Sequence, residues 1–178
     1  MKYFAGYLIE GEAGGYYKKV TADLSSHFGI KDLSKHIPPH LTLKPPFETE
    51  DITPFEKIIE GLVEKEEVLP FSIDEYGRFN LESETIFLSV QQQQNLQEKA
   101  EKILSTLADF GNNQKPVHLP LKLHASIARH LTPHKSQEIW EYVSSLPVPH
   151  FDLQFDNLTL FVFQNDNWEV RKIYRFIK

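Results

Sequence analysis

Apolar and polar positions divide most of the chain into short strands and longer helices. In the segment 85–91, Ile86, Leu88 and Val90 alternate with the residues between them, and this period of two predicts a strand. Further strands outside the motifs described below are predicted at about residues 3–9, 71–79, 151–163 and 168–177. The last two are predicted to form a hairpin that turns at residues 165–167.

Four segments show the spacing of three and four residues that is typical of a helix with one buried face. They are predicted at about residues 15–28, from Thr53 to Val63, at 95–110, and from Thr132-Pro133 onward. Gly29 is placed to end the first helix. The segment 53–56 has the N-cap threonine, first-position proline and returning glutamate of a capped helix start. Mixed helices and strands with hairpins predict an α+β fold with antiparallel sheets.

Two short segments repeat one order of side chains: a histidine, an apolar residue, a hydroxyl residue and an apolar residue. They are HLTL at residues 40–43 and HASI at residues 124–127, in strands predicted at about 40–44 and 119–129. Residues i and i+2 of a strand point to the same side, so each copy places an imidazole and a hydroxyl on one face. Each motif also precedes a helix that opens with Thr-Pro, which suggests an ancient duplication. Two such strands facing across a groove would bring these four side chains together.

The bulk composition narrows the classes of protein to consider. The 178 residues, 40% of them hydrophobic, suit a single domain over residues 1–178 with a sizeable core. No apolar run approaches the roughly 20 residues that a membrane-spanning helix needs, and the first residues do not read as a signal peptide. Cysteine is absent, which excludes disulfides and thiol nucleophiles and favours a cytoplasmic protein. The net charge of −6 argues against an extended contact with long duplex nucleic acid.

The paired motifs contain the side chains that phosphodiester cleavage requires. In-line displacement needs one group that takes a proton from the nucleophile and another that gives a proton to the leaving oxygen. Histidine suits both roles because its ordinary pKa of about 6.5 lies near working pH. His40 and His124 could therefore divide the two roles without a metal. Thr42 and Ser126 would each donate a hydrogen bond to a non-bridging phosphate oxygen.

Three basic residues lie close to the motifs. Arg129 follows the second motif and could stabilise developing negative charge on a phosphate. By strict alternation, however, its side chain points toward the core, so it would need a twist or a bulge at the strand end to reach the groove. Lys44 and Lys122 could add positive potential to the groove, and the pattern fits solvated strand-end lysines equally well.

At these residues the sequence resembles the 2H phosphoesterase superfamily, which includes the bacterial and archaeal 2′-5′ RNA ligase-like proteins. Their signature is a pair of H-x-T/S-x motifs, here HLTL at 40–43 and HASI at 124–127. The second motif continues to Ala128 and Arg129, which looks like the longer form that ends in Ala-Arg in many RNA ligase-like members. Ala125 is smaller than the usual apolar residue, and the basic content is lower than in members that hold RNA tightly. The resemblance covers essentially the whole chain.

The resemblance implies a bilobal fold with two antiparallel sheets related by a pseudo-two-fold axis, a central cleft, and helices packed outside. It implies a metal-independent phosphodiesterase that hydrolyses a 2′,3′-cyclic phosphate or a 2′-5′ linkage of a nucleotide or RNA end, and some members ligate reversibly. By analogy His40 and His124 are the acid–base pair, and Thr42, Ser126 and Arg129 are the substrate-binding residues. We expect no cofactor, a small nucleotide or an RNA terminus as the partner, and a monomer.

Several other residues carry weaker signals. His36 could line the rim of the cleft, and a loop histidine in water fits as well. His130 and His134 flank the second motif strand, but their spacing from the motif histidine does not define a metal site, so no metal is expected. Tyr76 and Phe79 lie on a strand that could stack a base, although most of the aromatic residues must belong to the core.

Two other functions remain open at this point. The same cleft could bind a nucleotide or an RNA terminus without turnover, although the presence of both histidines argues against a degenerate site. Alternatively, the motifs could be structural parts of an interaction protein, and the two histidines would then be buried or far apart. The residues do not name the exact substrate, and they do not say which histidine is the acid.

Overall fold

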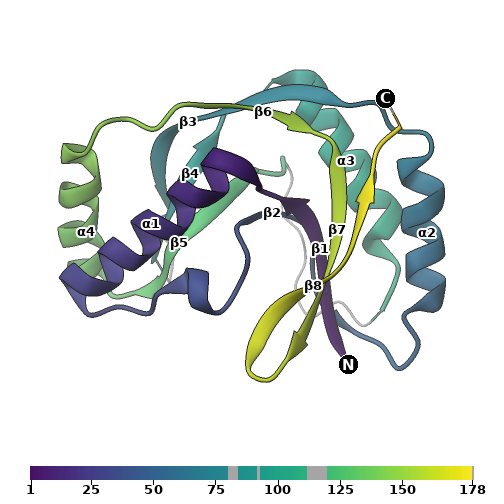
Figure 1. Cartoon of the computed structure of the whole chain (residues 1–178), viewed down its shortest axis with the longest axis horizontal. Coiled ribbons are helices and arrows are strands. Elements are labelled where there is room, and N and C mark those ends of the chain that lie inside the picture. The colour runs from purple at the N-terminus through teal and green to yellow at the C-terminus, as the bar shows by residue number, and fades with distance from the viewer. Residues whose placement is uncertain (80–83, 92, 112–119, 178) are drawn as a thin grey trace.

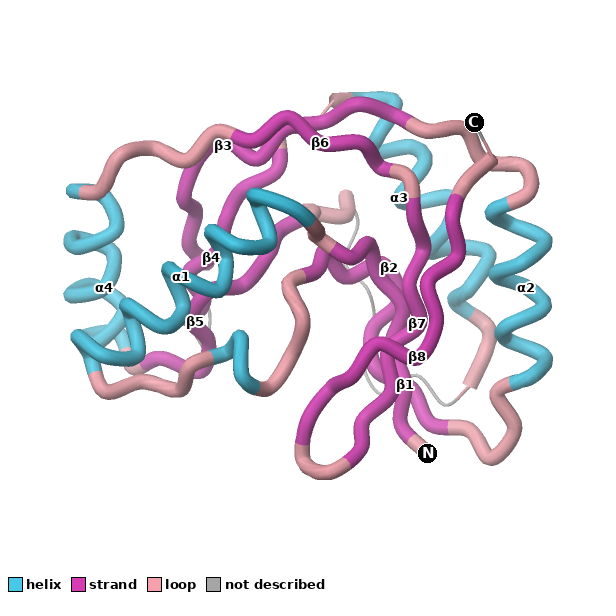
Figure 2. The backbone as a smooth tube through the Cα atoms, in the orientation of Figure 1, coloured by secondary structure: helices cyan, strands magenta, loops and turns pink. Residues whose placement is uncertain are grey.

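The structure is a computed structural model that describes residues 1–79, 84–91, 93–111 and 120–177. These residues form two four-stranded antiparallel sheets and four α-helices (Figure 1), which confirms the predicted α+β class. Figure 2 shows the strands in the middle of the molecule, with helices α1 (Gly11–Phe28) and α4 (Pro133–Ser145) on one side and α2 (Thr53–Val63) and α3 (Gln94–Ala108) on the other. None of the described helices is both long and apolar enough to cross a membrane.

The two motif strands are edge strands of different sheets. The first sheet has the order β2–β1–β7–β8, with β1 (Lys2–Leu8), β2 (His40–Glu48), β7 (Asn157–Gln164) and β8 (Asn167–Arg175). The second has the order β5–β4–β3–β6, with β3 (Leu69–Phe79), β4 (Glu84–Val90), β5 (His124–Leu131) and β6 (Phe151–Phe155). The edges β2 and β5 pack against each other where the two sheets meet (Figure 1).

Two of the helices pack on the sheet to which their preceding strand does not belong. Helix α1 (Gly11–Phe28) follows β1 of the first sheet but packs on β5 of the second, beside α4 (Pro133–Ser145). Helix α3 (Gln94–Ala108) follows β4 of the second sheet but packs on β2 of the first, beside α2 (Thr53–Val63). Each sheet is therefore covered by two helices, and one of these two follows a strand of the other sheet. A 3₁₀ turn, η1 (Leu33–Lys35), connects α1 to β2.

Alternation along the strands divides the apolar residues between two faces. The apolar residues of both motifs, Leu41, Leu43, Ala125 and Ile127, are fully buried as the alternation predicts. They belong to one core shared by both sheets and all four helices. A smaller cluster, formed by Phe4, Leu8, Leu33, Ile37 and Phe161, lies on the opposite face of β1, with Trp168 packed against it. This second cluster supports the β2 side of the region between the sheets.

The predicted strand at 151–163 is wrong in one respect, because it is two strands in different sheets. Strand β6 pairs with β3, whereas β7 pairs with β1 and β8. The change of sheet occurs at Asn157, whose buried side-chain amide accepts from Leu8 N (2.9 Å) and donates to Leu8 O (3.2 Å). The amide thus satisfies a main-chain donor and acceptor of β1 beyond Gly6, the last β1 residue in the β1–β7 register.

The remaining differences from the sequence-based expectation lie at the ends of elements. The second motif strand begins at His124, residues 120–123 are not strand, and residue 119 lies outside the described residues. Thr53 does not cap α2, because Ile52 is its N-cap and the Asp51 carboxylate accepts from the Thr53 main-chain N–H instead. Local sequence patterns do not determine such ends, since neighbouring side chains compete for the same free N–H groups.

Other predicted ends are confirmed. Thr132 caps α4 through a hydrogen bond from Lys135 N to its hydroxyl (3.3 Å), and Gly29 ends α1 in the left-handed conformation, with φ at 65°. The hairpin between β7 and β8 turns at Asn165 and Asp166, which have φ of 50° and 60°. Positive φ at both central residues is typical of the tight turns that match the twist of a hairpin.

Candidate active site

The two motif histidines occupy equivalent places in the two sheets. His40 is the first residue of β2 and His124 is the first residue of β5, and both side chains are half-buried. Because β2 and β5 pack against each other, the two rings come from distant parts of the sequence to one region. Their proximity also has an electrostatic effect, since the charge on His124 lowers the pKa of His40.

The rings are held by the same hydrogen bond. His40 Nδ1 lies 2.8 Å from the carbonyl oxygen of Pro38, and His124 Nδ1 lies 2.7 Å from the carbonyl oxygen of Lys122. A carbonyl oxygen only accepts, so Nδ1 must be the donor in both rings. In the neutral imidazole the other nitrogen, Nε2, then has a free lone pair. In both rings, Nε2 is therefore the nitrogen that can take up a proton.

Each imidazole also lies against two phenyl rings. The centroid of His40 is 4.7 Å from that of Phe4 and 5.5 Å from that of Phe161. The centroid of His124 is 4.9 Å from that of Phe79 and 5.0 Å from that of Phe87. These contacts restrict the rotation of each imidazole. They also remove water from part of each ring, which disfavours the charged form.

The pKa of both histidines is consequently depressed. Burial lowers the pKa of His40 to about 4, and the charges of Arg129 and His124 lower it as well. Burial also lowers the pKa of His124, with further lowering by the charges of Lys122 and Arg129. The hydrogen bonds to the two carbonyls oppose these shifts without cancelling them. Near neutral pH, both rings are therefore predominantly neutral without a bound anion.

The side chain of Arg129 reaches the same region because β5 contains a bulge. Phe87 pairs with Ser126 and the preceding residue, Ile86, pairs with Ala128, so one extra residue is inserted into β5. Strict alternation would point Arg129 toward the core, and that expectation is wrong because the bulge reverses the alternation. Arg129 is exposed, its charge lowers the pKa of both histidines, and no carboxylate of the described residues pairs with it.

The two hydroxyl residues follow their histidines along the same strand face. Thr42 and Ser126 are half-buried, two residues after His40 and His124 respectively. Thr42 lies opposite Gly6 of β1, where a Cβ atom would come within 2.4 Å of the Leu41 carbonyl oxygen. Only glycine therefore permits β1 to approach β2 this closely. The second motif has no such glycine, since Phe87 lies opposite Ser126.

Sequence reasoning missed Tyr17 as a residue of this region. Its hydroxyl, on the buried side of α1, donates a hydrogen bond to the main-chain oxygen of Ser126 (3.0 Å). Burial raises the pKa of this hydroxyl, and the nearby charge of Arg129 opposes that rise. Helix α1 thus supports the second motif directly at the bulge. The sequence showed Tyr17 only as part of the apolar stripe of a helix, and no local signal distinguishes it.

The two flanking lysines have different positions. Lys44 is neither solvated nor in the groove: it is buried, and its ammonium donates to the main-chain oxygen of Ala108 (2.9 Å). Burial accordingly lowers the pKa of Lys44. Lys122 is exposed and its ammonium lies over the rings of Phe79 (5.3 Å) and Phe87 (5.2 Å), beside His124. Of these two lysines, therefore, only Lys122 adds positive charge next to a motif histidine.

Three other histidines that the sequence singled out, His36, His130 and His134, have different contacts from the motif pair. His36 Nδ1 bonds the side-chain oxygen of Asn167 (2.8 Å), and His134 lies 3.8 Å from the carboxylate of Glu138. His130 is exposed and has φ of 58°. Within the ranges that the structure describes, no three histidine or acidic side chains are grouped as metal ligands.

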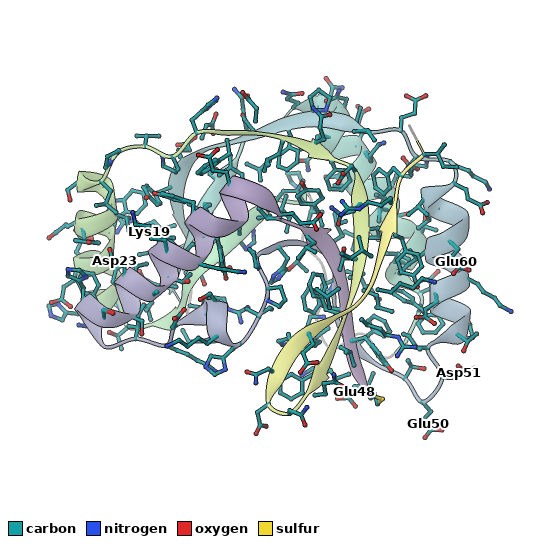
Figure 3. The ribbon with its side chains drawn as sticks, viewed as in Figure 1. Lys19, Asp23, Glu48, Glu50, Asp51 and Glu60 are labelled. Carbon is teal, nitrogen blue, oxygen red and sulfur yellow. The ribbon has the colours of Figure 1, made fainter. Side chains whose placement is uncertain are left out.

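Four acidic side chains at the other end of β2 and on α2 lie away from the two motif histidines. Glu48 is the last residue of β2, Glu50 and Asp51 follow this strand, and Glu60 lies on α2. Figure 3 shows these four side chains at the outer end of that half of the molecule, not where β2 and β5 meet. The net charge of −6 therefore does not describe the local field at the histidines, where Arg129 contributes positive charge.

Comparisons with known proteins agree on one family. The family model described as the 2′-5′ RNA ligase superfamily matches residues 21–167, which include both motifs. A protein of Geobacillus sp. (strain WCH70) with the provisional name phosphoesterase is 26% identical over 181 residues, covering 98% of this chain and 95% of the relative. A protein of Geobacillus kaustophilus (strain HTA426) with the same provisional name is 26% identical over 169 residues, covering 93% and 88%.

Solved structures show the same fold at low sequence identity. Escherichia coli LigT complexed with 3′-AMP has a TM-score of 0.64 at 14% identity, covering 99% of this chain and 98% of that one. The protein TT0787 of Thermus thermophilus has a TM-score of 0.60 at 16% identity, with the same coverage. LigT has also been solved with ATP and with NADP+.

Proposed function

Because the chain belongs to the 2′-5′ RNA ligase superfamily and is a 2H-type phosphoesterase, we propose that it hydrolyses a 2′,3′-cyclic phosphate or a 2′-5′ phosphodiester of a nucleotide or RNA end. The observation that carries this proposal is the matched pair of imidazoles. His40 and His124 begin adjoining strands, each is fixed through Nδ1 to a carbonyl oxygen, and each presents Nε2. One ring would serve as the base and the other as the acid.

The reaction would proceed by in-line attack of water on phosphorus. The neutral imidazole takes a proton from the water as its oxygen attacks, and the protonated imidazole gives its proton to the leaving sugar oxygen. A bound phosphate is an anion, so it raises the pKa of a neighbouring imidazole and makes the acid form accessible near neutral pH. After the reaction the two rings have exchanged protonation states, and exchange with water restores the starting pair.

Three further side chains would hold the phosphate. Thr42 and Ser126, on the same strand faces as the histidines, would each donate to a non-bridging oxygen. Arg129 would bind the oxygens that gain charge in the transition state, because the bulge turns its guanidinium into the region and no carboxylate of the described residues pairs with it. Tyr17 would act as a positioning residue, because its hydrogen bond fixes the main chain of Ser126 beside that bulge.

The proposed function is tested by a product screen. The purified chain is incubated with 2′,3′-cyclic AMP and with 2′-5′-linked and 3′-5′-linked ApA, and products are resolved by chromatography and phosphorus NMR. We expect hydrolysis of the cyclic phosphate or the 2′-5′ dimer and no cleavage of the 3′-5′ dimer. Thermal stabilisation by nucleotides with no product would instead support a binding module.

The pH dependence of kcat/KM for the free enzyme should be bell-shaped, with its maximum on the acid side of 6.5. The productive pair has one protonated and one neutral imidazole, and the pKa of His40 is about 4 while that of His124 is also lowered from 6.5. Activity should therefore rise as pH increases past about 4 and fall again as the second proton is lost. Initial rates at low substrate between pH 3.5 and 9 measure this profile, and a plateau extending above pH 8 would contradict it.

Lys122 offers a specific check on that profile. Its charge lowers the pKa of His124, so Lys122→Ala should move the alkaline limb to higher pH. The matched control is Lys57→Ala on α2, an exposed lysine remote from both motifs, which should leave both limbs unchanged. An equal shift in both variants would mean that a general change in net charge, and not the local field, governs the profile.

Arg129→Met should lower kcat by about a hundredfold, the usual cost of removing one donor to transition-state charge. Arg129→Lys should retain part of the activity, because it keeps the charge but loses the forked geometry. Since the Arg129 charge lowers the pKa of both histidines, the methionine variant should also move both limbs of the pH profile upward. Loss of activity with unchanged limbs would indicate that Arg129 is remote from the histidines and acts on folding.

A further inference from the structure

Trp168 lies one aromatic ring away from His40. It is the second residue of β8, and its indole packs edge-on against Phe4, with centroids 4.8 Å apart and an interplanar angle of 80°. Phe4 is in turn the ring that contacts His40 at 4.7 Å. In a nucleotide, a single sugar separates the phosphate from the base. The indole therefore lies at a suitable distance for the base of a nucleotide whose phosphate lies at His40.

A cavity of about 440 Å³ lies beside this indole. Its apolar wall is formed by Ile30, Leu33, Ile37, Leu131, Phe163 and Trp168. Its polar lining contains two cations, Lys31 and Arg129, together with His36, His130 and the carboxylate of Asp166. Arg129 is the guanidinium whose charge lowers the pKa of both motif histidines. The cavity and the candidate active site thus share Arg129. Its volume falls within the range of small-ligand sites, about 300–1,000 Å³.

The position of the indole is fixed by the chain on both sides of the cavity. The main-chain N–H of Trp168 donates to the carbonyl oxygen of His36 (2.8 Å), and the His36 ring bonds the side chain of Asn167 (2.8 Å). Phe163 packs against the indole at 5.3 Å from the other side of the hairpin. Ligand binding therefore need not order this segment, which preserves affinity.

The aromatic residues that the sequence suggested for base stacking are less suitable. The Tyr76 hydroxyl is hydrogen-bonded to Tyr16 of α1, and the Tyr76 side chain is buried in the core. Phe79 packs against Phe87 at 4.4 Å, and Lys122 covers its face at 5.3 Å. Trp168 is half-buried, unlike Tyr76, and it borders a cavity.

We propose that the cavity beside Trp168 binds the nucleobase of the substrate, with the indole as the stacking surface. The mixture of flat apolar walls and a shared guanidinium fits a planar ring that is attached to a phosphate. The substrate class is then a base-bearing nucleotide or RNA end, as distinct from a simple phosphodiester. This inference rests on the function proposed above and assigns the specificity of that same site to Trp168.

The kinetic test compares two cyclic phosphates that differ only in the base. They are 2′,3′-cyclic AMP and the 2′,3′-cyclic phosphate of methyl riboside, and the readout is the ratio of their kcat/KM values. We expect Trp168→Leu to lower this ratio about tenfold, mainly through KM for the nucleotide. The matched control, Trp140→Phe on α4, should leave the ratio unchanged. The ratio does not depend on the fraction of folded enzyme, and an unchanged ratio in Trp168→Leu would overturn the proposal.

If neither compound is hydrolysed, that result counts against the proposed function but not against the nucleobase site. A binding test then decides whether the nucleobase site exists. The chain has two tryptophans, so Trp140→Phe leaves Trp168 as the only indole fluorophore. We expect 3′-AMP to quench its fluorescence saturably, and ribose 3-phosphate and inorganic phosphate not to do so. Absence of quenching by 3′-AMP, or equal quenching by all three, would overturn the nucleobase site even if hydrolysis is observed.

Discussion

His40→Ala and His124→Ala are each expected to lower kcat for 2′,3′-cyclic AMP by about a thousandfold or more while the fold survives. Each variant removes one proton-transfer group, and such groups contribute typically 10²–10⁴-fold. Both side chains are half-buried at the first residue of an edge strand, so their loss creates no cavity in the main core. Activity is measured by product formation, and the fold by circular dichroism and the thermal midpoint of unfolding.

The control for this experiment is His134→Ala, which removes an exposed histidine of α4 that lies 3.8 Å from the carboxylate of Glu138. It should retain full activity. The double variant of His40 and His124 should be little worse than either single variant, because groups that act as one unit are strongly non-additive. Activity should also survive dialysis against EDTA, since the proposed proton transfers need no metal. Full activity in either single histidine variant would eliminate the acid–base mechanism.

Asn157→Ala should lower the free energy of unfolding by about 3 kcal/mol. The variant leaves both the N–H and the carbonyl oxygen of Leu8 without a side-chain partner in the buried interior, at about 1–3 kcal/mol for each group. Leu8 pairs with His40 in the β1–β2 ladder, so the same amide steadies the strand beside the candidate active site. Urea unfolding followed by fluorescence gives the free energy and the slope m.

Thr159→Val is the matched control for this loss. It removes one hydrogen bond, from the Thr159 hydroxyl to the Asn157 side-chain oxygen (2.9 Å), and keeps the shape of the side chain. Its cost should be about 1 kcal/mol, because both main-chain groups of Leu8 keep their partners. Equal destabilisation in the two variants would show that packing, and not the Asn157 amide, stabilises the passage of the chain between the sheets.

Local sequence patterns predicted most of the elements because their causes are local. Alternation placed Leu41 and Leu43 on the buried face of β2, and a capping threonine placed the start of α4 at Pro133. The α+β class with antiparallel sheets follows from the same patterns, the arrangement in two sheets was implied by the family resemblance, and both are confirmed. The catalytic roles of His40 and His124 stay predictions.

Interactions between distant segments account for what the patterns missed. The bulge that turns Arg129 out of the core depends on how β5 pairs with β4, which no periodicity within β5 reveals. The hydrogen bond of Tyr17 to Ser126 requires α1 to cross to the other sheet. Lys44 resembles a strand-end lysine in the sequence and is buried only because α3 packs over β2.

The amino-acid sequence alone thus determined which residues have the chemistry: two histidines, each followed by a hydroxyl on the same face of a strand. Only the tertiary structure decided what surrounds them. Burial against phenyl rings and the nearby charge of Arg129 depress the pKa of both imidazoles, and the hairpin places Trp168 beside a cavity. The physical reason is that side-chain type and strand period are properties of neighbours in sequence, whereas desolvation and electrostatic fields come from neighbours in space.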